Sequence, residues 1–102
     1  MIALLKQKQS PLTDLCRRYH VARLEVFGSA ATGEFDPDTS DIDFLVEFHS
    51  TQAMNAADQY FGLLEDLQNL FGRRIDLVCA KAMRNRYFIQ RVNQSRRTLY
   101  AA

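Results

Sequence analysis

The sequence lacks the features that mark several large classes of protein. Its 102 residues carry 13 basic and 12 acidic side chains, and the net charge of +1 gives no indication of bulk nucleic-acid binding. The apolar start Met1–Leu5 is too short to span a membrane or to act as a secretory signal. We find no repeat, low-complexity tract or linker. These absences favour one domain over residues 1–102, with no membrane contact and no direct nucleic-acid binding.

Cysteine is scarce as well, with two residues in the chain, Cys16 and Cys79. They lie far apart in the sequence, and each belongs to an apolar pattern. Since no secretory signal precedes them, we expect two buried free thiols in a cytoplasmic protein, although the spacing leaves a disulfide open.

Apolar periodicity predicts both helices and strands. The clearest helix starts after Ser10, a typical N-cap residue that Pro11 follows, and the longest helix ends before Gly72, which is typical of helix C-termini. The pattern predicts helical turns within residues 2–9, helices over 11–19, 30–32, 53–71 and 82–95, and strands over 23–27, 41–48 and 73–79. Leu99 and Tyr100 are apolar enough to pack on the core or on a partner.

The strand over residues 41–48 is the stretch around which the chain is organised, and two aspartates open it. Side chains two residues apart point to the same face of a strand, so Asp41 and Asp43 present their carboxylates side by side. The alternation predicts that the opposite face carries Ile42, Phe44, Val46 and Phe48. Two like charges placed close together cost free energy unless a cation neutralises them. Mg²⁺ takes oxygen ligands and binds through one or two carboxylates plus substrate phosphates. The pair predicts a site for a metal-bound nucleoside triphosphate, with a solvated strand face as the alternative.

A glycine turn lies close to these aspartates in the sequence. Gly28 and Ser29 follow the apolar end of the strand over 23–27, where a turn offers free backbone N–H groups and space for phosphate oxygens. A third aspartate, Asp76, is embedded in the apolar strand over 73–79. Such a carboxylate needs a partner or a metal if it is buried, although a surface position on an edge strand is the alternative.

These motifs resemble the signature of the DNA polymerase β-like nucleotidyltransferase superfamily, and the length and element order resemble its smallest branch, the minimal nucleotidyltransferases (MNT). The signature consists of Gly28-Ser29, Gly33 and Ser40-Asp41-Ile42-Asp43. The resemblance implies an α/β (α+β) fold, in which a small mixed sheet of three to four strands is flanked by helices. It also implies catalytic and metal-binding roles for Asp41, Asp43 and Asp76, and nucleotide-binding roles for Gly28, Ser29, Gly33 and Ser40.

The resemblance further implies a reaction and a partner. The three aspartates would hold two Mg²⁺ ions, and ATP would be the substrate. The minimal nucleotidyltransferases act as antitoxins of HEPN toxins, which are small helical RNases, and several silence the toxin by transferring AMP to one of its tyrosines. The expectation is therefore an antitoxin of a type VII-like pair that is a protein adenylyltransferase. An antitoxin that only masks its toxin is one alternative, and a nucleotidyltransferase acting on a small molecule such as an aminoglycoside is another.

One departure from the family pattern concerns positive charge. Members of this branch often carry an arginine between the Gly-Ser pair and the next glycine, whereas this chain has Ala30-Ala31-Thr32. If that arginine holds phosphate in the family, Arg73, Arg74 or Lys81 takes its place here, and weak activity is the alternative. The C-terminal arginines are expected to form a solvated face, with a partner surface or a triphosphate contact from one of them as alternatives; they are Arg84, Arg86, Arg91, Arg96 and Arg97.

Overall fold

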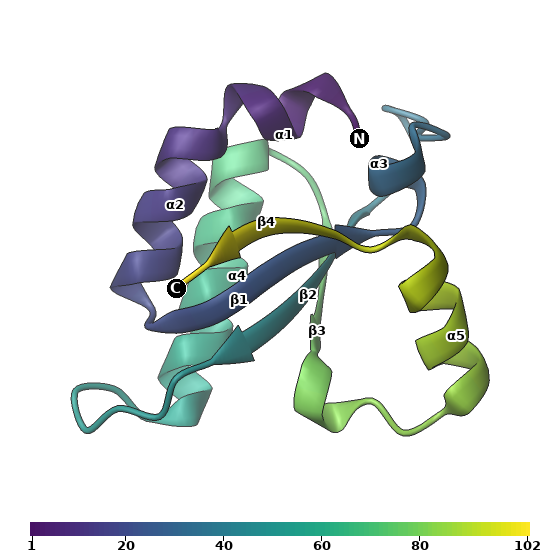
Figure 1. Ribbon diagram of the computed structural model, residues 1–102. Coiled ribbons are helices and arrows are strands. Elements are labelled where there is room, and N and C mark those ends of the chain that lie inside the picture. Colours follow the sequence, from purple (N-terminus) through teal and green to yellow (C-terminus); the bar gives the residue numbers. More distant parts are fainter.

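A computed structural model describes the whole chain, residues 1–102 (Figure 1). Along the chain lie α1 (Ala3–Gln7), α2 (Gln9–Arg18), β1 (Val21–Phe27), α3 (Ser29–Thr32), β2 (Ile42–Phe48), α4 (Ala56–Phe71), β3 (Ile75–Cys79), a 3₁₀ turn (Ala80–Ala82), α5 (Arg86–Ser95) and β4 (Arg97–Ala101).

The four strands form one mixed sheet in the order β3-β2-β1-β4. β1 pairs antiparallel with both β2 and β4, whereas β2 and β3 run parallel because α4 carries the chain back across the sheet. The expected small mixed sheet flanked by helices is therefore confirmed. Its fourth strand contains Leu99 and Tyr100, which pack partly buried against the core.

The two faces of the sheet carry different layers. α1, α2 and α4 cover one face (Figure 1), where Ile42, Phe44 and Val46 of β2 join the main core. Leu45 points to the other face and forms a smaller cluster with Phe27 and with Val92 of α5. The predicted alternation along β2 is confirmed, and it places Asp43 on the face that α5 covers.

The start of α2 differs from the prediction. The helix begins at Gln9 after Lys8, and no side chain caps it, so the prediction of Ser10 as the N-cap is wrong. Pro11 is tolerated because the first turn of a helix contains N–H groups that have no partner within the helix.

Asparagine side chains set the starts of α4 and α5. Asn55 accepts a hydrogen bond from the Asp58 N–H at 2.8 Å, so α4 begins at residue 56 rather than at 53. Asn85 accepts in the same way from the N–H groups of Tyr87 and Phe88, so α5 begins at Arg86 rather than at residue 82, and the 3₁₀ turn ends where the predicted helix was to start. β1 begins at Val21, two residues before the strand predicted over 23–27, and β3 begins at Ile75, two residues after the start predicted for the strand over 73–79.

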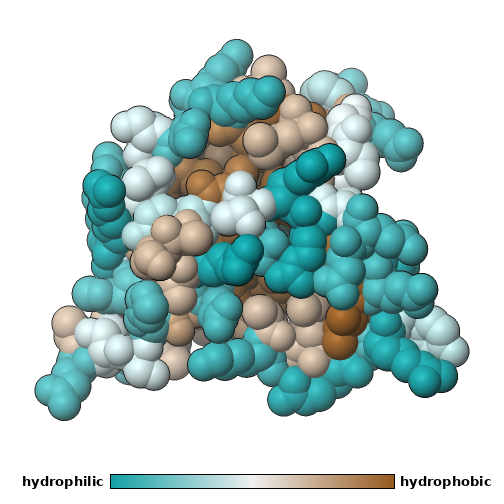
Figure 2. Space-filling view, in the orientation of Figure 1, coloured by the Kyte–Doolittle hydropathy of each residue, from teal (hydrophilic) through white to brown (hydrophobic).

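Hydrophilic side chains cover the outer surface of the helices, and hydrophobic ones gather beside α1 and between the sheet and α5 (Figure 2). None of the helices has the length and apolar composition that crossing a membrane requires. Both cysteines are free thiols; Cys16 is buried, as expected, but Cys79 is partly exposed.

Gly62 of α4 packs directly against the ring of Tyr19, whose hydroxyl donates a hydrogen bond to Asp66. A Cβ at this position would lie 2.5 Å from Tyr19 Cε1. We therefore expect Gly62→Ala to lower the free energy of unfolding by about 1–3 kcal/mol, measured by urea denaturation. An unhindered helix would instead gain about 1 kcal/mol from this substitution.

The control for this substitution removes the ring. In a Tyr19→Leu background, Gly62→Ala should stabilise the protein, because the clash no longer exists. A raised urea midpoint for the single Gly62→Ala variant would contradict the packing described here.

Candidate active site

Gly28 of the predicted glycine turn and Asp43, the second aspartate of the Asp-x-Asp pair, line one cavity. This cavity measures about 270 Å³ and lies where the end of β1 and the start of β2 meet α5. Its lining residues are Phe27, Gly28, Thr32, Asp43, Phe88, Arg91, Val92, Gln94 and Ser95. Two motifs that are fifteen residues apart in the sequence thus share one wall, because β1 and β2 pair antiparallel there.

Gly28 lies close to the Asp43 carboxylate. Phe27 pairs with Asp43 in the register of the two strands, so the turn that follows lies beside that carboxylate. A Cβ on Gly28 would lie 2.6 Å from Asp43 Oδ2, and the residue has a φ of +71°, which side-chain-bearing residues rarely adopt. The backbone conformation therefore favours glycine, and any side chain here would force the Asp43 carboxylate to move.

The amide groups of the turn serve different partners. The N–H of Gly28 donates to Ser95 Oγ at 2.9 Å. The N–H groups of Ser29 and Ala30 form no hydrogen bond within the chain. Ser29, rather than Gly28, therefore carries the free amide that a phosphate-binding turn needs.

Asp43 and Asp76 lie directly opposite each other on the parallel strands β2 and β3. Burial, together with the negative charges of Asp76 and Asp41, raises the pKa of Asp43 from 3.8 to about 6. Carboxylate oxygens are the ligands that hard divalent cations prefer, and a cation would relieve this repulsion. The chemistry of this pair therefore fits a divalent cation.

Asp41 precedes β2 and faces a different side chain. Arg74 Nε lies 3.2 Å from Asp41 Oδ1, and this pair is exposed enough to contribute about 0–1 kcal/mol. Asp41 also lines a separate cavity of about 240 Å³ with Ser40 and Arg73. No three His, Cys, Asp or Glu side chains are grouped closely enough to hold a metal ion together. The structure therefore brings Asp43 and Asp76 together and pairs Asp41 with an arginine.

Gly33 and Ser40 belong to the loop that precedes Asp41, and they do not line the cavity of Gly28 and Asp43. Gly33 ends α3 with a φ of +91°. Ser40 Oγ accepts from the Asp36 N–H at 3.0 Å, which closes the loop. Arg73 fastens the loop from outside, since its guanidinium stacks 4.8 Å from the Phe35 ring and donates to the Ser40 carbonyl at 3.4 Å.

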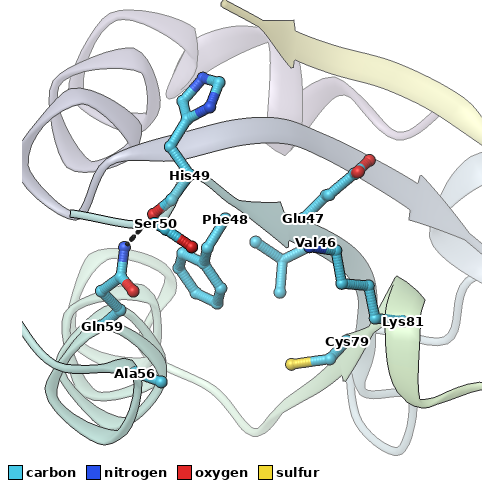
Figure 3. A pocket seen from close by; sticks show the side chains of 9 residues that line it. All are labelled: Val46, Glu47, Phe48, His49, Ser50, Ala56, Gln59, Cys79 and Lys81. Carbon is cyan, nitrogen blue, oxygen red and sulfur yellow. Dashed lines mark hydrogen bonds between the residues drawn. The ribbon is translucent and has the colours of Figure 1, made fainter.

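The three cations expected near the phosphates do not line the cavity of Gly28 and Asp43. Arg73 fastens the loop, and Arg74 pairs with Asp41. Lys81 lines a cavity of about 220 Å³ at the opposite end of β2 and β3, together with Cys79 and Gln59 (Figure 3). Arg91 of α5, one of the arginines expected to be solvated, is the positive side chain that lines the cavity of Gly28 and Asp43.

Sequence reasoning missed the residues that fasten α5 to the sheet. Ser95 binds the Gly28 amide, and the neighbouring Arg96 donates to the buried carboxylate of Glu25. One signal was available: Glu25 interrupts the apolar strand 24–27, and a carboxylate there needs a cationic partner if it is buried. The identity of that partner could not be found from local pattern, because 71 residues separate the two.

The pKa of Asp43 leads to a pH dependence of stability. Asp43 ionises at lower pH in the unfolded chain than in the folded protein, where its pKa is about 6. The folded state therefore loses stability as pH rises from about 4 to about 6. We expect Asp43→Asn to remove this loss and to raise the free energy of unfolding at pH 7 by about 1 kcal/mol, a value reduced by partial exposure.

Thermal unfolding at pH 4, 5, 6 and 7 measures the effect. Asp14→Asn, which alters an exposed aspartate of α2, serves as the matched control and should follow the wild type. Identical pH profiles for the wild type and Asp43→Asn would show that the neighbouring carboxylates do not repel Asp43.

Comparison with known proteins agrees with this geometry. Residues 11–100 match the family described as nucleotidyltransferase domain. The protein adenylyltransferase MntA of Thermococcus cleftensis is 34% identical over 85 residues, which cover 79% of this chain and 82% of that protein. A solved "Structure of putative minimal nucleotidyltransferase" is 30% identical with a TM-score of 0.75, covering 91% of this chain and 90% of that one.

A more distant structure shares the fold. It holds the tri-AMPylated HEPN toxin of Shewanella oneidensis in complex with its MNT antitoxin, and the matching chain is 18% identical with a TM-score of 0.66. The match covers 96% of this chain and 73% of that one. The length of the family match and the identity to these relatives show that the chain belongs to the nucleotidyltransferase domain family, with the fold of a minimal nucleotidyltransferase.

Proposed function

We propose that this protein is an antitoxin that transfers AMP from ATP to a tyrosine hydroxyl of a HEPN toxin and thereby neutralises it. The observation that carries the proposal is the close approach of Gly28 to Asp43, which sets a turn with free amide groups beside a pair of carboxylates. The 34% identity to a protein adenylyltransferase supports AMP as the transferred group. The HEPN toxin in the distant structure supports the partner class.

ATP is held in this proposal by the turn and the cavity beside it. The free N–H groups of Ser29 and Ala30 and the Ser29 hydroxyl donate to phosphate oxygens. Because Gly28 has no side chain, the phosphates approach Asp43 without obstruction.

Asp43 and Asp76 would hold divalent cations, two Mg²⁺ ions in the proposal, and Asp41 would join them when Arg74 releases it. When bound, Mg²⁺ neutralises the charge of the phosphates and acidifies the acceptor hydroxyl.

The transfer itself exchanges one phosphorus–oxygen bond for another. The acceptor oxygen bonds to the α-phosphorus, the bond from that phosphorus to the oxygen bridging to the β-phosphate breaks, and pyrophosphate leaves. Asp76 accepts the proton of the acceptor hydroxyl at its carboxylate. Asp76 is exposed on the edge strand β3, where a side chain of another protein can reach it. Positioning and charge neutralisation supply the catalysis, which a small fold can provide.

Intact-mass spectrometry of the co-expressed toxin tests the proposed transfer. The wild type should add mass to the toxin in steps of one AMP. Asp43→Asn and Asp76→Asn should each slow the transfer by about 100-fold or more, as expected when charged groups that stabilise a transition state are lost. Asp14→Asn should leave the transfer unchanged.

The remaining outcomes separate the alternatives. A toxin that stays unmodified yet is neutralised, by the wild type and by both variants, would make this protein a masking antitoxin. Transfer of AMP to an aminoglycoside in place of the toxin would make it a small-molecule nucleotidyltransferase.

Cation binding has a readout that is independent of activity. Anything that binds only the folded state raises the melting temperature. We expect Mg²⁺ in the millimolar range to raise the melting temperature of the wild type and to leave that of Asp43→Asn nearly unchanged, because the variant lacks the like-charge pair. An equal rise in both proteins would place the bound cation away from Asp43.

A further inference from the structure

One face of α5 forms the wall of the cavity opposite the glycine turn. Phe88, Arg91 and Ser95 follow one another at helical spacings of three and four residues, and all three line the cavity. The Phe88 ring packs edge-on against Phe27, with ring centroids 5.9 Å apart, and Val92 is buried beneath. α5 therefore holds Arg91 and Ser95 at fixed positions across from Gly28 and Asp43.

Ser95 has a donor that no group in the chain accepts. Its Oγ accepts the hydrogen bond from Gly28, and no hydrogen bond that Ser95 itself donates from this hydroxyl is present. A serine hydroxyl has one hydrogen to donate and two lone pairs to accept with. Since Ser95 lines the cavity, this hydrogen can be donated to an acceptor placed there.

Arg91 supplies the positive charge of the same cavity. It is exposed, belongs to none of the ion pairs of the chain, and shares the cavity lining with Asp43. A polyanion bound beside Asp43 meets the repulsion of that carboxylate, and an opposing guanidinium offsets such repulsion and can bind phosphate oxygens through two parallel hydrogen bonds.

An ion pair between Arg96 and the buried carboxylate of Glu25 fixes the end of α5 that carries Ser95. Arg96 Nε donates to Glu25 Oε2 at 2.9 Å, and Glu25 is only 4% exposed. The hydrogen bond from Arg96 holds the pKa of Glu25 below its usual value. Arg96 also donates to Asn93 at 2.7 Å. The position of Ser95 is therefore fixed by two contacts with the sheet: the ion pair of the adjacent Arg96 with Glu25 on β1, and its own hydrogen bond from Gly28.

We propose that Ser95 and Arg91 form the α5 half of a binding site for the triphosphate of a nucleotide, an inference that rests on the proposed nucleotidyltransferase function. The Ser95 hydroxyl accepts a hydrogen bond from the Gly28 amide and donates its own hydrogen to a phosphate oxygen, so it links that amide to the phosphate. Arg91 neutralises the charge of the β- and γ-phosphates, which AMP lacks. These two residues thus distinguish ATP from AMP.

The opposite role for Ser95 is physically possible and predicts the opposite result. If the Ser95 hydroxyl occupied the place of a phosphate oxygen on the Gly28 amide, removing it would free that amide. Ser95→Ala would then bind ATP more tightly than the wild type.

Isothermal titration calorimetry of the full chain in buffer containing Mg²⁺ tests the inference with three ligands: ATP, AMP and inorganic triphosphate. We expect Ser95→Ala and Arg91→Ala each to weaken the binding of ATP and of inorganic triphosphate by about 10-fold or more, which is typical of a lost hydrogen bond to a charged group. AMP binding should stay within about twofold of the wild type. Ser95→Thr and Arg91→Lys should recover part of the affinity.

Arg86→Ala is the matched control, because Arg86 is an exposed arginine of the same helix that does not line the cavity. It should bind all three ligands as the wild type does. Equal melting temperatures of the variants would show that lost binding does not reflect lost folding.

Each other result overturns either this inference or the proposed function. Equal weakening of ATP and AMP, tighter ATP binding by Ser95→Ala, or a wild type that binds neither ATP nor inorganic triphosphate would overturn the inference. Unchanged affinities in a wild type that transfers AMP would overturn the inference alone. Weakened triphosphate binding by both variants, in a wild type that modifies no acceptor, would support the inference and overturn the proposed function.

Discussion

The repulsion between carboxylates on adjacent strands is the constraint on which the rest of the site depends. Asp43 and Asp76 lie opposite each other because β2 and β3 run parallel in register. Burial of Asp43, together with the negative charges of Asp76 and Asp41, raises the pKa of Asp43 to about 6. A protein tolerates such a cost where the charge is needed, since perturbed carboxylates are typical of functional sites. Positive charge is arranged around the pair, with Arg74 on Asp41 and Arg91 across the cavity.

The sheet and α5 divide the work of building the cavity. The antiparallel pairing of β1 with β2 brings the Gly28 turn against Asp43, where a side chain at residue 28 would displace the carboxylate. α5 reaches the same place through the hydrogen bond from Gly28 to Ser95, and the Glu25–Arg96 pair fixes its end on β1. Glu25 is buried, so its carboxylate needs cationic partners, and Arg96 supplies one of them from the end of α5 while Arg23 supplies the other from β1.

Local sequence patterns predicted much of the fold and part of the site. The alternation along β2 placed Asp43 on the face opposite the main core, and Gly28-Ser29 with the Asp-x-Asp pair indicated a nucleotide site, because these features depend on residues close in sequence. Helix starts were predicted less well, since apolar periodicity does not show where the side chains of Asn55 and Asn85 cap α4 and α5. The strand β4 was not predicted, because five residues at the end of a chain gain their structure from pairing with β1.

By itself the sequence determined the chemistry: which carboxylates, glycines and serines are available, and their order along two strands. The tertiary structure decided which of them meet. In the folded chain Gly28 lies against Asp43 and donates a hydrogen bond to Ser95. Asp41 pairs with Arg74, and Lys81 lies at the other end of β2 and β3. The physical reason is that burial of all the apolar side chains together sets the strand register and the helix packing. A contact between residues far apart in the sequence follows from this overall packing and cannot be deduced from the neighbours of either residue.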